Sequence, residues 1–209
     1  MEKGPVHNTI MKYLSIMFVI VLFAGIGCIG SSPYKEVTPS DLISSPQDFE
    51  GKQVCINGIL ENSSISGIEI ETTSGDQNKG SFVKACGTYE NGKIKPDSVN
   101  TTLSVATEKE IYHSNETLKV YVDFNSPDAG SAEIQVSGIK NMFDTPLVSE
   151  KKNVRIEKGN NRIDFEFTTP SCEECSALKP GTFFINSSVS LGEKTYEAYT
   201  KITLERETQ

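Results

Sequence analysis

The sequence predicts an all-β protein, with a small barrel over residues 38–99 followed by a seven-stranded β-sandwich over residues 101–206. Val, Ile, Thr, Phe and Tyr recur in short runs in which apolar and polar residues alternate, as they do in half-buried strands. No long segment repeats apolar residues at helical spacing. Beyond residue 100, turn residues recur about every ten positions, a spacing typical of sandwiches.

The chain begins with a segment that is typical of export signals. Lys12 supplies a positive end, residues 14–26 supply an apolar core, and small residues precede Cys28. The apolar core is shorter than the roughly 20 residues that span a bilayer, which disfavours an uncleaved anchor. We therefore expect residues 1–27 to be a signal peptide, and Met11 is the better start of translation.

The residues Gly25-Ile26-Gly27-Cys28 resemble the lipobox of prokaryotic exported lipoproteins, including those of archaeal type. In such proteins the cysteine becomes the new N-terminus and carries a lipid. The resemblance implies a lipid on Cys28, a tether over residues 28–37, and a position at the outer face of the cell membrane. Stable anchoring takes more than one hydrocarbon chain, since each buried methylene adds about 0.8 kcal/mol. An uncleaved signal anchor and an ordinary cleaved signal are the alternatives.

The composition is acidic. The whole chain has a formal net charge of −8, and removal of residues 1–27 takes away two basic side chains and one acidic one, which leaves −9. A chain of this charge is repelled by nucleic acids and by anionic lipid headgroups, so neither is an expected partner. Solubility explains the excess of Asp and Glu.

Five cysteines divide into one for the lipid and two pairs, Cys55 with Cys86 and Cys172 with Cys175. Export permits disulfides, and lipidation of one cysteine leaves an even number. The residues around Cys55 and Cys86 alternate so that both thiols lie on the polar, outward face of their strands. If these strands are neighbours, a cross-strand disulfide is geometrically reasonable.

Cys172 and Cys175 form a C-x-x-C motif, which occurs in redox-active dithiols and as half of zinc sites. The motif lies between two predicted strands, is bracketed by prolines, and contains two glutamates that disfavour a thiolate. We therefore favour a disulfide that closes a loop. An extracytoplasmic dithiol or disulfide protein that uses this pair is the alternative function.

The barrel segment opens with a capped helical turn over residues 39–46, which a proline ends. An Asn-Gly pair at Asn91 is a strong signal for a hairpin between the last two strands. Four short strands in this region favour a small barrel, and they are predicted at residues 49–60, 67–72, 81–89 and 93–99.

The segments Phe49-Glu-Gly-Lys-Gln-Val-Cys-Ile-Asn-Gly58 and Cys86-Gly-Thr-Tyr-Glu-Asn-Gly-Lys-Ile94 resemble the OB-fold modules of exported prokaryotic proteins. In that fold the first and fourth strands are neighbours, so the resemblance places Cys55 beside Cys86. A full third strand has little room between residues 72 and 81, which allows for an incomplete barrel. OB-folds often bind oligonucleotides or oligosaccharides. The acidic composition leaves a glycan, a protein ligand or a purely structural role.

The pattern changes near residue 101 to longer strands, and residues 96–100 are the predicted hinge. Residues 117–124 alternate cleanly, with Leu118, Val120 and Val122 on the inner face. The seven predicted strands cover residues 103–106, 117–124, 132–139, 153–157, 162–168, 182–191 and 195–205.

The segments Glu108–Val120 and Pro180–Ile185 resemble parts of exported Ig-like domains, including adhesion-related and macroglobulin-like ones. The resemblance implies an immunoglobulin-like sandwich over residues 101–206. Kinship with antibody domains is not implied, since the chain has no tryptophan. These motifs specify a fold rather than a ligand.

Few residues indicate catalysis or metal binding. His113 is the one histidine beyond residue 27 and falls in the predicted turn between the first two sandwich strands, which excludes triads and multi-histidine metal sites. No phosphate-binding glycine loop and no calcium loop occurs in the sequence. Two pairs of acids, Glu69 with Glu71 and Asp76 with Asp97, are best explained as solvated strand edges. We therefore expect no catalytic residues, no metal and no cofactor.

Glycosylation sequons begin at Asn62, Asn100, Asn115 and Asn186, and all four lie in the part of the chain predicted to be exported. The sequence as a whole predicts a non-enzymatic cell-surface lipoprotein that binds, or structurally supports, an envelope protein or glycan. A purely structural spacer within the envelope is a further interpretation.

Overall fold

The computed structural model describes residues 33–71, 79–171 and 178–206. The chain divides by its internal contacts into two units, Met1–Pro33 and Tyr34–Gln209, and every element described below belongs to the second. The described part of this unit is built almost entirely of strands, with one short α-helix and one short 3₁₀-helix. The all-β prediction is confirmed.

A short helix precedes the barrel. α2 (Pro39–Ser44) begins at Thr38, whose side chain accepts a hydrogen bond from the Asp41 backbone N–H, while the Asp41 carboxylate accepts one from the Thr38 N–H. This reciprocal capping satisfies two backbone donors and fixes the start of the helix. η1 (Pro46–Asp48) follows at the proline that was predicted to end the helical turn. Leu42 is fully buried and packs into the barrel core.

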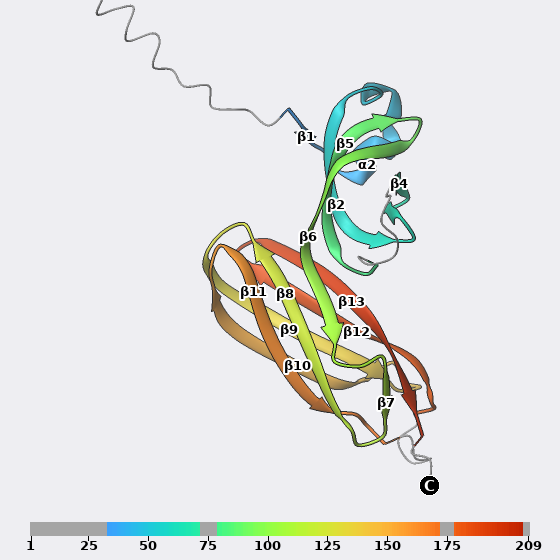
Figure 1. The fold of residues 1–209 in the computed structure, drawn as a ribbon, viewed down its shortest axis with the longest axis vertical. Coiled ribbons are helices and arrows are strands. Elements are labelled where there is room, and N and C mark those ends of the chain that lie inside the picture. The colour runs from blue at the N-terminus through green and yellow to red at the C-terminus, as the bar shows by residue number, and fades with distance from the viewer. Residues whose placement is uncertain (1–32, 72–78, 172–177, 207–209) are drawn as a thin grey trace, which may run out of the picture. The chain divides into compact units, whose positions relative to one another are not determined.

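Five strands form a closed barrel (Figure 1): β2 (Gln53–Glu61), β3 (Ser64–Ile65), β4 (Ile68–Ile70), β5 (Phe82–Glu90) and β6 (Lys93–Thr107). Pairing runs β2-β3-β4-β6-β5 and returns to β2, with β4 and β6 parallel. The OB-like barrel is therefore confirmed, and its ring is complete. The additional strand of the ring is β3, which was not predicted, whereas β4 falls within the strand predicted at residues 67–72. β1 (Lys35–Glu36) pairs in parallel with β2, inside the segment predicted as a tether.

β6 continues from the barrel into the sandwich without interruption (Figure 1). It pairs with β5 up to Leu103 and with β8 (Thr117–Ser126) from Leu103 to Thr107. The hinge predicted at residues 96–100 is therefore wrong, since these residues belong to a paired strand. Pro96 lies at a shift of register between β5 and β6, and a bulge is a place where a strand tolerates a residue without an N–H.

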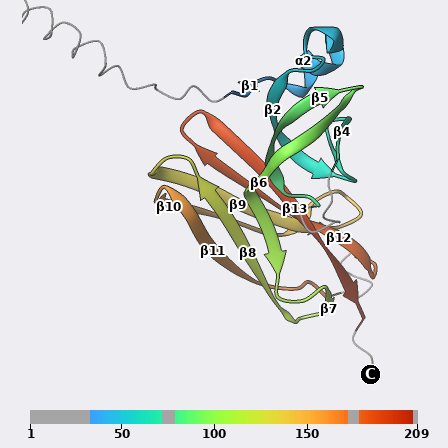
Figure 2. The same ribbon diagram turned by 45° about the horizontal axis from the view of Figure 1, so that its top comes forward.

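The sandwich packs two sheets face to face (Figure 2). The first sheet continues from the barrel through β6, β8 and β11 (Gly159–Thr168). The apolar residues between the sheets form one buried cluster, in which Leu118, Val120 and Val122 are fully buried as predicted. The second sheet has the order β10-β9-β12-β13-β7, with β10 (Pro146–Ile156), β9 (Gly130–Lys140), β12 (Gly181–Leu191), β13 (Lys194–Glu205) and β7 (Ile111–His113).

Two strands of the second sheet differ from the prediction. β7 was not expected, and His113 is its last residue rather than a turn residue. The strand has only three residues, too few for an alternating pattern, and it forms by pairing in parallel with β13. β10 begins at Pro146 rather than at residue 153. The start of this edge strand was not predicted because it contains a proline and several charged residues. Edge strands nevertheless commonly carry both.

Candidate functional site

The predicted disulfide between Cys55 and Cys86 is present. The two residues are direct cross-strand partners on β2 and β5, with Cα atoms 4.1 Å apart. Their neighbour Val54 belongs to the barrel core, so the sulfur atoms lie on the outer face, as predicted. The cysteines are nevertheless only 2% and 6% exposed. Glu36 lies beside Cys55 and forms an ion pair with Lys84, so neighbouring side chains surround the disulfide.

The other three cysteines, Cys28, Cys172 and Cys175, lie outside the described residues. The lipid and the second pair therefore stay predictions. The segment that carries the second pair has buried residues on both sides, since Thr169 is 1% and Leu178 is 5% exposed.

The four sequon asparagines occupy two kinds of position. Asn62 and Asn115 lie in turns and have positive φ angles of 47° and 61°. Asn100 lies within β6 and Asn186 within β12, where both are exposed. Glycosylation of these residues stays a prediction.

Two of the acids considered for catalysis make structural contacts. A carboxylate oxygen of Glu69 lies 2.8 Å from Nζ of Lys93 across the β4–β6 pair, and this contact raises the pKa of Lys93. Asp97 accepts a hydrogen bond of 2.8 Å from the Tyr34 hydroxyl, which raises the pKa of Tyr34. Asp76 lies outside the described residues. The contacts of Glu69 and Asp97 fit strand-edge roles.

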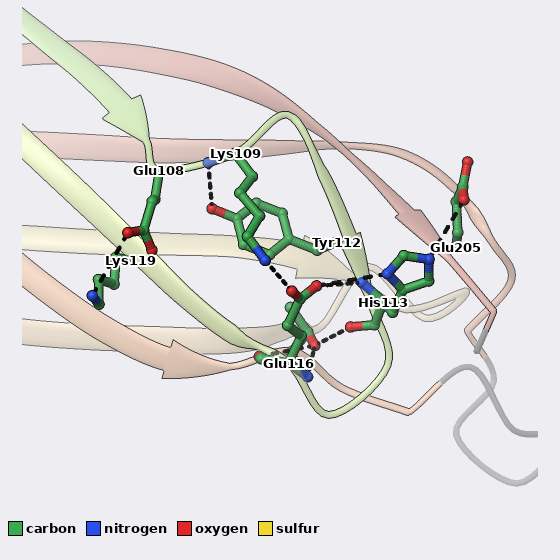
Figure 3. Close-up of polar contacts among 8 residues, drawn as sticks. Glu108, Lys109, Tyr112, His113, Glu116, Lys119 and Glu205 are labelled. Carbon is green, nitrogen blue, oxygen red and sulfur yellow. Dashed lines mark hydrogen bonds and ion pairs between the residues drawn. The ribbon is translucent and has the colours of Figure 1, made fainter. Parts of the chain in front are cut away.

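Charged side chains gather where β7 turns into β8 (Figure 3). His113 lies between two carboxylates, with Nδ1 3.8 Å from Oε2 of Glu116 and Nε2 3.7 Å from Oε2 of Glu205. Both distances are longer than a hydrogen bond. These contacts are ion pairs only when the imidazole carries a charge. Lys109 contacts the other oxygen of Glu116. The hydroxyl of the buried Tyr112 accepts a hydrogen bond of 3.0 Å from the Lys109 backbone N–H.

Glu116 and Thr169 fix the shape of this turn. Oε2 of Glu116 accepts a hydrogen bond of 2.9 Å from the His113 N–H. The Glu116 N–H donates to the Thr169 hydroxyl at 2.8 Å, and that hydroxyl donates to the His113 carbonyl at 2.5 Å. Hydrogen bonds from Lys109 and from the His113 N–H lower the pKa of Glu116. The network thus joins the β7–β8 turn to the end of β11. Its polar groups form hydrogen bonds and ion pairs with one another.

Across residues 33–71, 79–171 and 178–206, no three His, Cys, Asp or Glu side chains come close enough together to hold a metal ion. The same residues include no helix that is both long and apolar enough to cross a membrane.

The hairpin between β9 and β10 presents two apolar side chains to solvent. Met142 and Phe143 are 68% and 74% exposed. They are the central residues of a β-turn in which the Asp144 N–H donates a hydrogen bond of 3.0 Å to the Asn141 carbonyl. We call residues 141–145 the hairpin tip.

Polar contacts at its base hold the hairpin tip in shape. The side-chain oxygen of Asn141 accepts hydrogen bonds of 2.9 Å and 3.1 Å from the N–H groups of Phe143 and Thr145. Nζ of Lys140 lies 3.0 Å from Oδ1 of Asp144. The conformation of the tip is therefore fixed by its own backbone and short polar side chains, while the two apolar side chains contribute to neither.

The hairpin tip and the His113 network lie at the same end of the second sheet. β9 ends at Lys140, and the pairing register aligns this end with the start of β12 at Gly181. Gly181 pairs with Leu204 of β13, which in turn lies beside Tyr112 of β7.

A hollow of about 300 Å³ lies on the outer face of the second sheet. The register brings polar residues together there, since Ser188 is the cross-strand partner of both Gln135 and Glu197, and Asn186 follows in the adjacent row. We call this the polar hollow, and its lining residues are Ile59, Gln135, Ser137, Asn186, Ser187, Ser188, Glu197, Ala198 and Tyr199.

Neither the hairpin tip nor the polar hollow was predicted from the sequence. An adjacent pair of bulky apolar residues between Asn141 and Asp144, two turn-forming residues, could have indicated an exposed tip. The hollow had no comparable signal, because it is assembled from four strands, β2, β9, β12 and β13, whose register the sequence does not give. Its one visible motif, the run starting at Asn186, was interpreted as a sequon.

No protein-family model matches the sequence, and the search of the curated proteins gives no match either. Solved structures share parts of the fold. A β-glucosidase from Erythrobacter marinus has 18% sequence identity and a TM-score of 0.37, and the match covers 49% of this chain and 15% of that enzyme. The CARDB domain of a Pyrococcus furiosus protein, solved with di-metal ions, has 16% identity and a TM-score of 0.34, with 51% of this chain and 93% of that domain covered.

The sulfur carrier protein SoxY from Chlorobium limicola has 17% identity and a TM-score of 0.32, with 48% of this chain and 78% of that chain covered. Each match covers about half of this chain. We base no functional argument on similarities of this level.

Proposed function

We propose that this chain is a non-enzymatic binding module, anchored by a lipid on Cys28 at the outer face of the cell membrane, that holds an envelope protein through its hairpin tip. The observation that carries the proposal is the exposure of Met142 and Phe143 on a turn fixed by hydrogen bonds to Asn141. Scattered apolar residues on a surface are ordinary, but two large adjacent ones on a fixed turn form a contact surface.

The chemistry of the hairpin tip favours an apolar pocket on a protein partner. Met and Phe are enriched at protein interfaces, and an aromatic side chain that fills a pocket often dominates the binding energy. Lys140 and Asp144 pair with each other, so the base of the tip brings no unpaired charge into the contact. The net charge of −8 disfavours insertion among anionic lipid headgroups.

The fixed conformation of the hairpin tip supports the same conclusion. Binding through a flexible loop costs conformational entropy, because each loop residue must be ordered in the complex. Asn141 orders this turn in advance through two backbone hydrogen bonds. The tip therefore loses little freedom when it binds.

The roles of the polar groups support a non-enzymatic function. Cys55 and Cys86 are joined and barely exposed, so neither offers a thiol for redox chemistry. Glu116 is engaged by Lys109 and by the backbone of His113, which makes it part of the turn. A dithiol function of Cys172 and Cys175 remains the alternative.

Photocrosslinking in intact cells of the source organism tests the proposal. A benzophenone amino acid replaces Phe143 in one variant and Ile43 in a matched control, since Ile43 is 60% exposed on helix α2. We expect position 143 to give a discrete adduct with an envelope protein that position 43 does not give. In the same cells, Cys28→Ser should move the protein from the membrane fraction into the medium.

The crosslinked partner, once purified, should bind the wild-type protein directly. Because the M142A/F143A double variant removes both apolar contacts, its Kd should be about tenfold higher or more. Equal Kd values, or the same adduct from positions 143 and 43, would contradict the role of the hairpin tip. Retention of the Cys28→Ser protein at the membrane would contradict the lipid anchor.

A further inference from the structure

The polar hollow presents side chains that have no partner within the described residues. Gln135, Ser137, Asn186, Ser188 and Glu197 make no side-chain hydrogen bond or ion pair with any residue that the structure describes. Elsewhere on the surface, exposed polar groups commonly pair with each other, as Glu133 and Lys151 of the same sheet do. The amides, hydroxyls and carboxylate of the hollow are therefore hydrated and open to a ligand.

Tyr199 forms a fixed aromatic wall beside these groups. Its hydroxyl donates a hydrogen bond of 2.8 Å to Glu61, and burial together with this bond raises the pKa of Tyr199, so the hydroxyl stays protonated. Its ring meets Phe184 edge to face, with centroids 5.3 Å apart. Phe184 is 48% exposed but does not line the hollow, and Nζ of Lys201 lies 5.0 Å from the centre of its ring. The Tyr199 N–H donates to the Gly80 carbonyl at 2.9 Å, which holds the backbone of this wall.

Small residues make the surface concave. Ser137 and Ser188 lie among the longer side chains of Gln135 and Glu197. A concave surface with a few unpaired polar groups beside a fixed aromatic ring is the kind of site that small polar ligands occupy. A sugar ring fits this chemistry, because its hydroxyls radiate from the rim and its C–H groups pack against aromatic carbon.

The charge of the lining selects among sugars. Of the described residues that line the polar hollow, Glu197 alone is charged. Phosphates and acidic sugars are recognised by cationic side chains, which this lining does not supply. The net charge of −8 also repels anionic ligands.

We propose that the polar hollow binds a short uncharged oligosaccharide. Asn186 and Gln135 offer amides that donate to and accept from adjacent hydroxyls, and Tyr199 supplies the apolar contact. The hollow and the hairpin tip use different residues, so this inference goes beyond the proposed function and does not depend on it.

Titrations followed by nuclear magnetic resonance test the inference. The probes are cellotetraose, maltotetraose and mannotetraose, with an oligogalacturonate of the same length as the charged comparison. The protein is produced in a host without N-glycosylation, so that Asn186 carries no glycan. We expect at least one neutral probe to shift the side-chain amide signals of Gln135 and Asn186 in a saturable way, and the oligogalacturonate to leave them unchanged.

Three variants separate recognition from general surface effects. Asn186→Ala removes an amide that can form two hydrogen bonds, so the Kd for the neutral sugar should rise about tenfold. Glu197→Gln keeps the planar hydrogen-bonding group and removes only the charge, so the Kd should stay within about twofold. Asn153→Ala is the matched control, since Asn153 is exposed on β10 of the same sheet and does not line the hollow.

The titrations and variants give outcomes that either support or overturn the inference. Saturable shifts that Asn186→Ala weakens and Asn153→Ala leaves unchanged support the inference. The absence of saturable shifts with all three neutral probes overturns it, and so does equal binding of the oligogalacturonate or an unchanged Kd in Asn186→Ala. The M142A/F143A variant should bind the sugar normally, while Asn186→Ala should still crosslink at position 143. Failure of either site is therefore distinguishable from failure of the other.

Discussion

Glu116 and Thr169 stabilise the β7–β8 turn through a small number of hydrogen bonds. The Thr169 hydroxyl accepts from the Glu116 N–H and donates to the His113 carbonyl, so one buried side chain satisfies two backbone groups. These partners are 53 and 56 residues apart in sequence, and no local pattern predicts such a contact. The cysteine pair on β2 and β5 was predictable because strand alternation gave its face and the barrel order gave its neighbour.

The pKa of Glu116 makes the stability of this turn depend on pH. Its pKa lies below the usual value of 4.5 in the folded protein, so its carboxylate adds stability above pH 4.5 and loses this contribution as the pH falls through the folded-state pKa. Glu116 in turn raises the pKa of Lys109 above 10.5, so that contribution is present below pH 10.5 and lost as the pH rises past the folded-state pKa.

Replacement of Glu116 by Gln (E116Q) should therefore lower the thermal midpoint most at neutral pH. The difference from wild type should shrink at the acidic and the strongly alkaline ends, which thermal unfolding across the pH range measures. Glu205→Gln is the control, since Glu205 lies 3.7 Å from His113 without a hydrogen bond and its loss should change little. A constant difference between wild type and E116Q at all pH values would refute the assignment.

At the level of elements, the length of the alternating pattern decided whether a strand was predicted. β8 alternates over ten residues and was placed correctly, with its inner face fully buried. β4 was predicted at residues 67–72, where two isoleucines alternate with glutamates. β3 and β7 contain two and three residues and were not predicted, because they form strands only by pairing with neighbouring strands. β10 was predicted too short because edge strands carry charges that weaken the alternating pattern.

The joining of β2 to β5 should stabilise the barrel strongly. The disulfide closes a loop with a sequence separation of 31 residues, and the double variant C55A/C86A should lower the free energy of unfolding by about 3–4 kcal/mol. Urea unfolding of both proteins measures the difference. C172A/C175A is the comparison, since the loop between these cysteines is short and predicts a loss of only about 2 kcal/mol. Equal midpoints for wild type and C55A/C86A would show that the cross-link does not support the fold.

At the level of the whole molecule, β6 belongs to both buried clusters. Ile94 lies in the barrel core, and Leu103 and Val105 lie in the sandwich core. The sequence suggested a hinge between them because proline and asparagine usually interrupt strands. The pairing of β5 with β6 continues through a bulge at Pro96, so residues that resemble a linker form part of a sheet.

Limited proteolysis distinguishes a hinge from a paired strand. A protease that cleaves before aspartate should cut before Asp128, in the turn between β8 and β9, much earlier than before Asp97 in β6. The reason is that Asp97 lies in a paired strand, whose backbone must open before it enters a protease active site. Rapid cleavage before Asp97 in the native protein would instead indicate that residues 96–100 form a hinge. Mass spectrometry of the early fragments identifies the site.

The continuity of β6 has a mechanical consequence. If the chain is tethered at its amino end and pulled at the hairpin tip, tension passes between the two cores along β6 and across the bonds from Tyr199 to Gly80 and Glu61. β6 forms hydrogen bonds to β5 and β8 at many positions along its length. A force along β6 therefore shears many of these bonds at once rather than breaking them one after another. In a chain anchored and bound as proposed above, such a joint would resist stretching between the membrane and the partner.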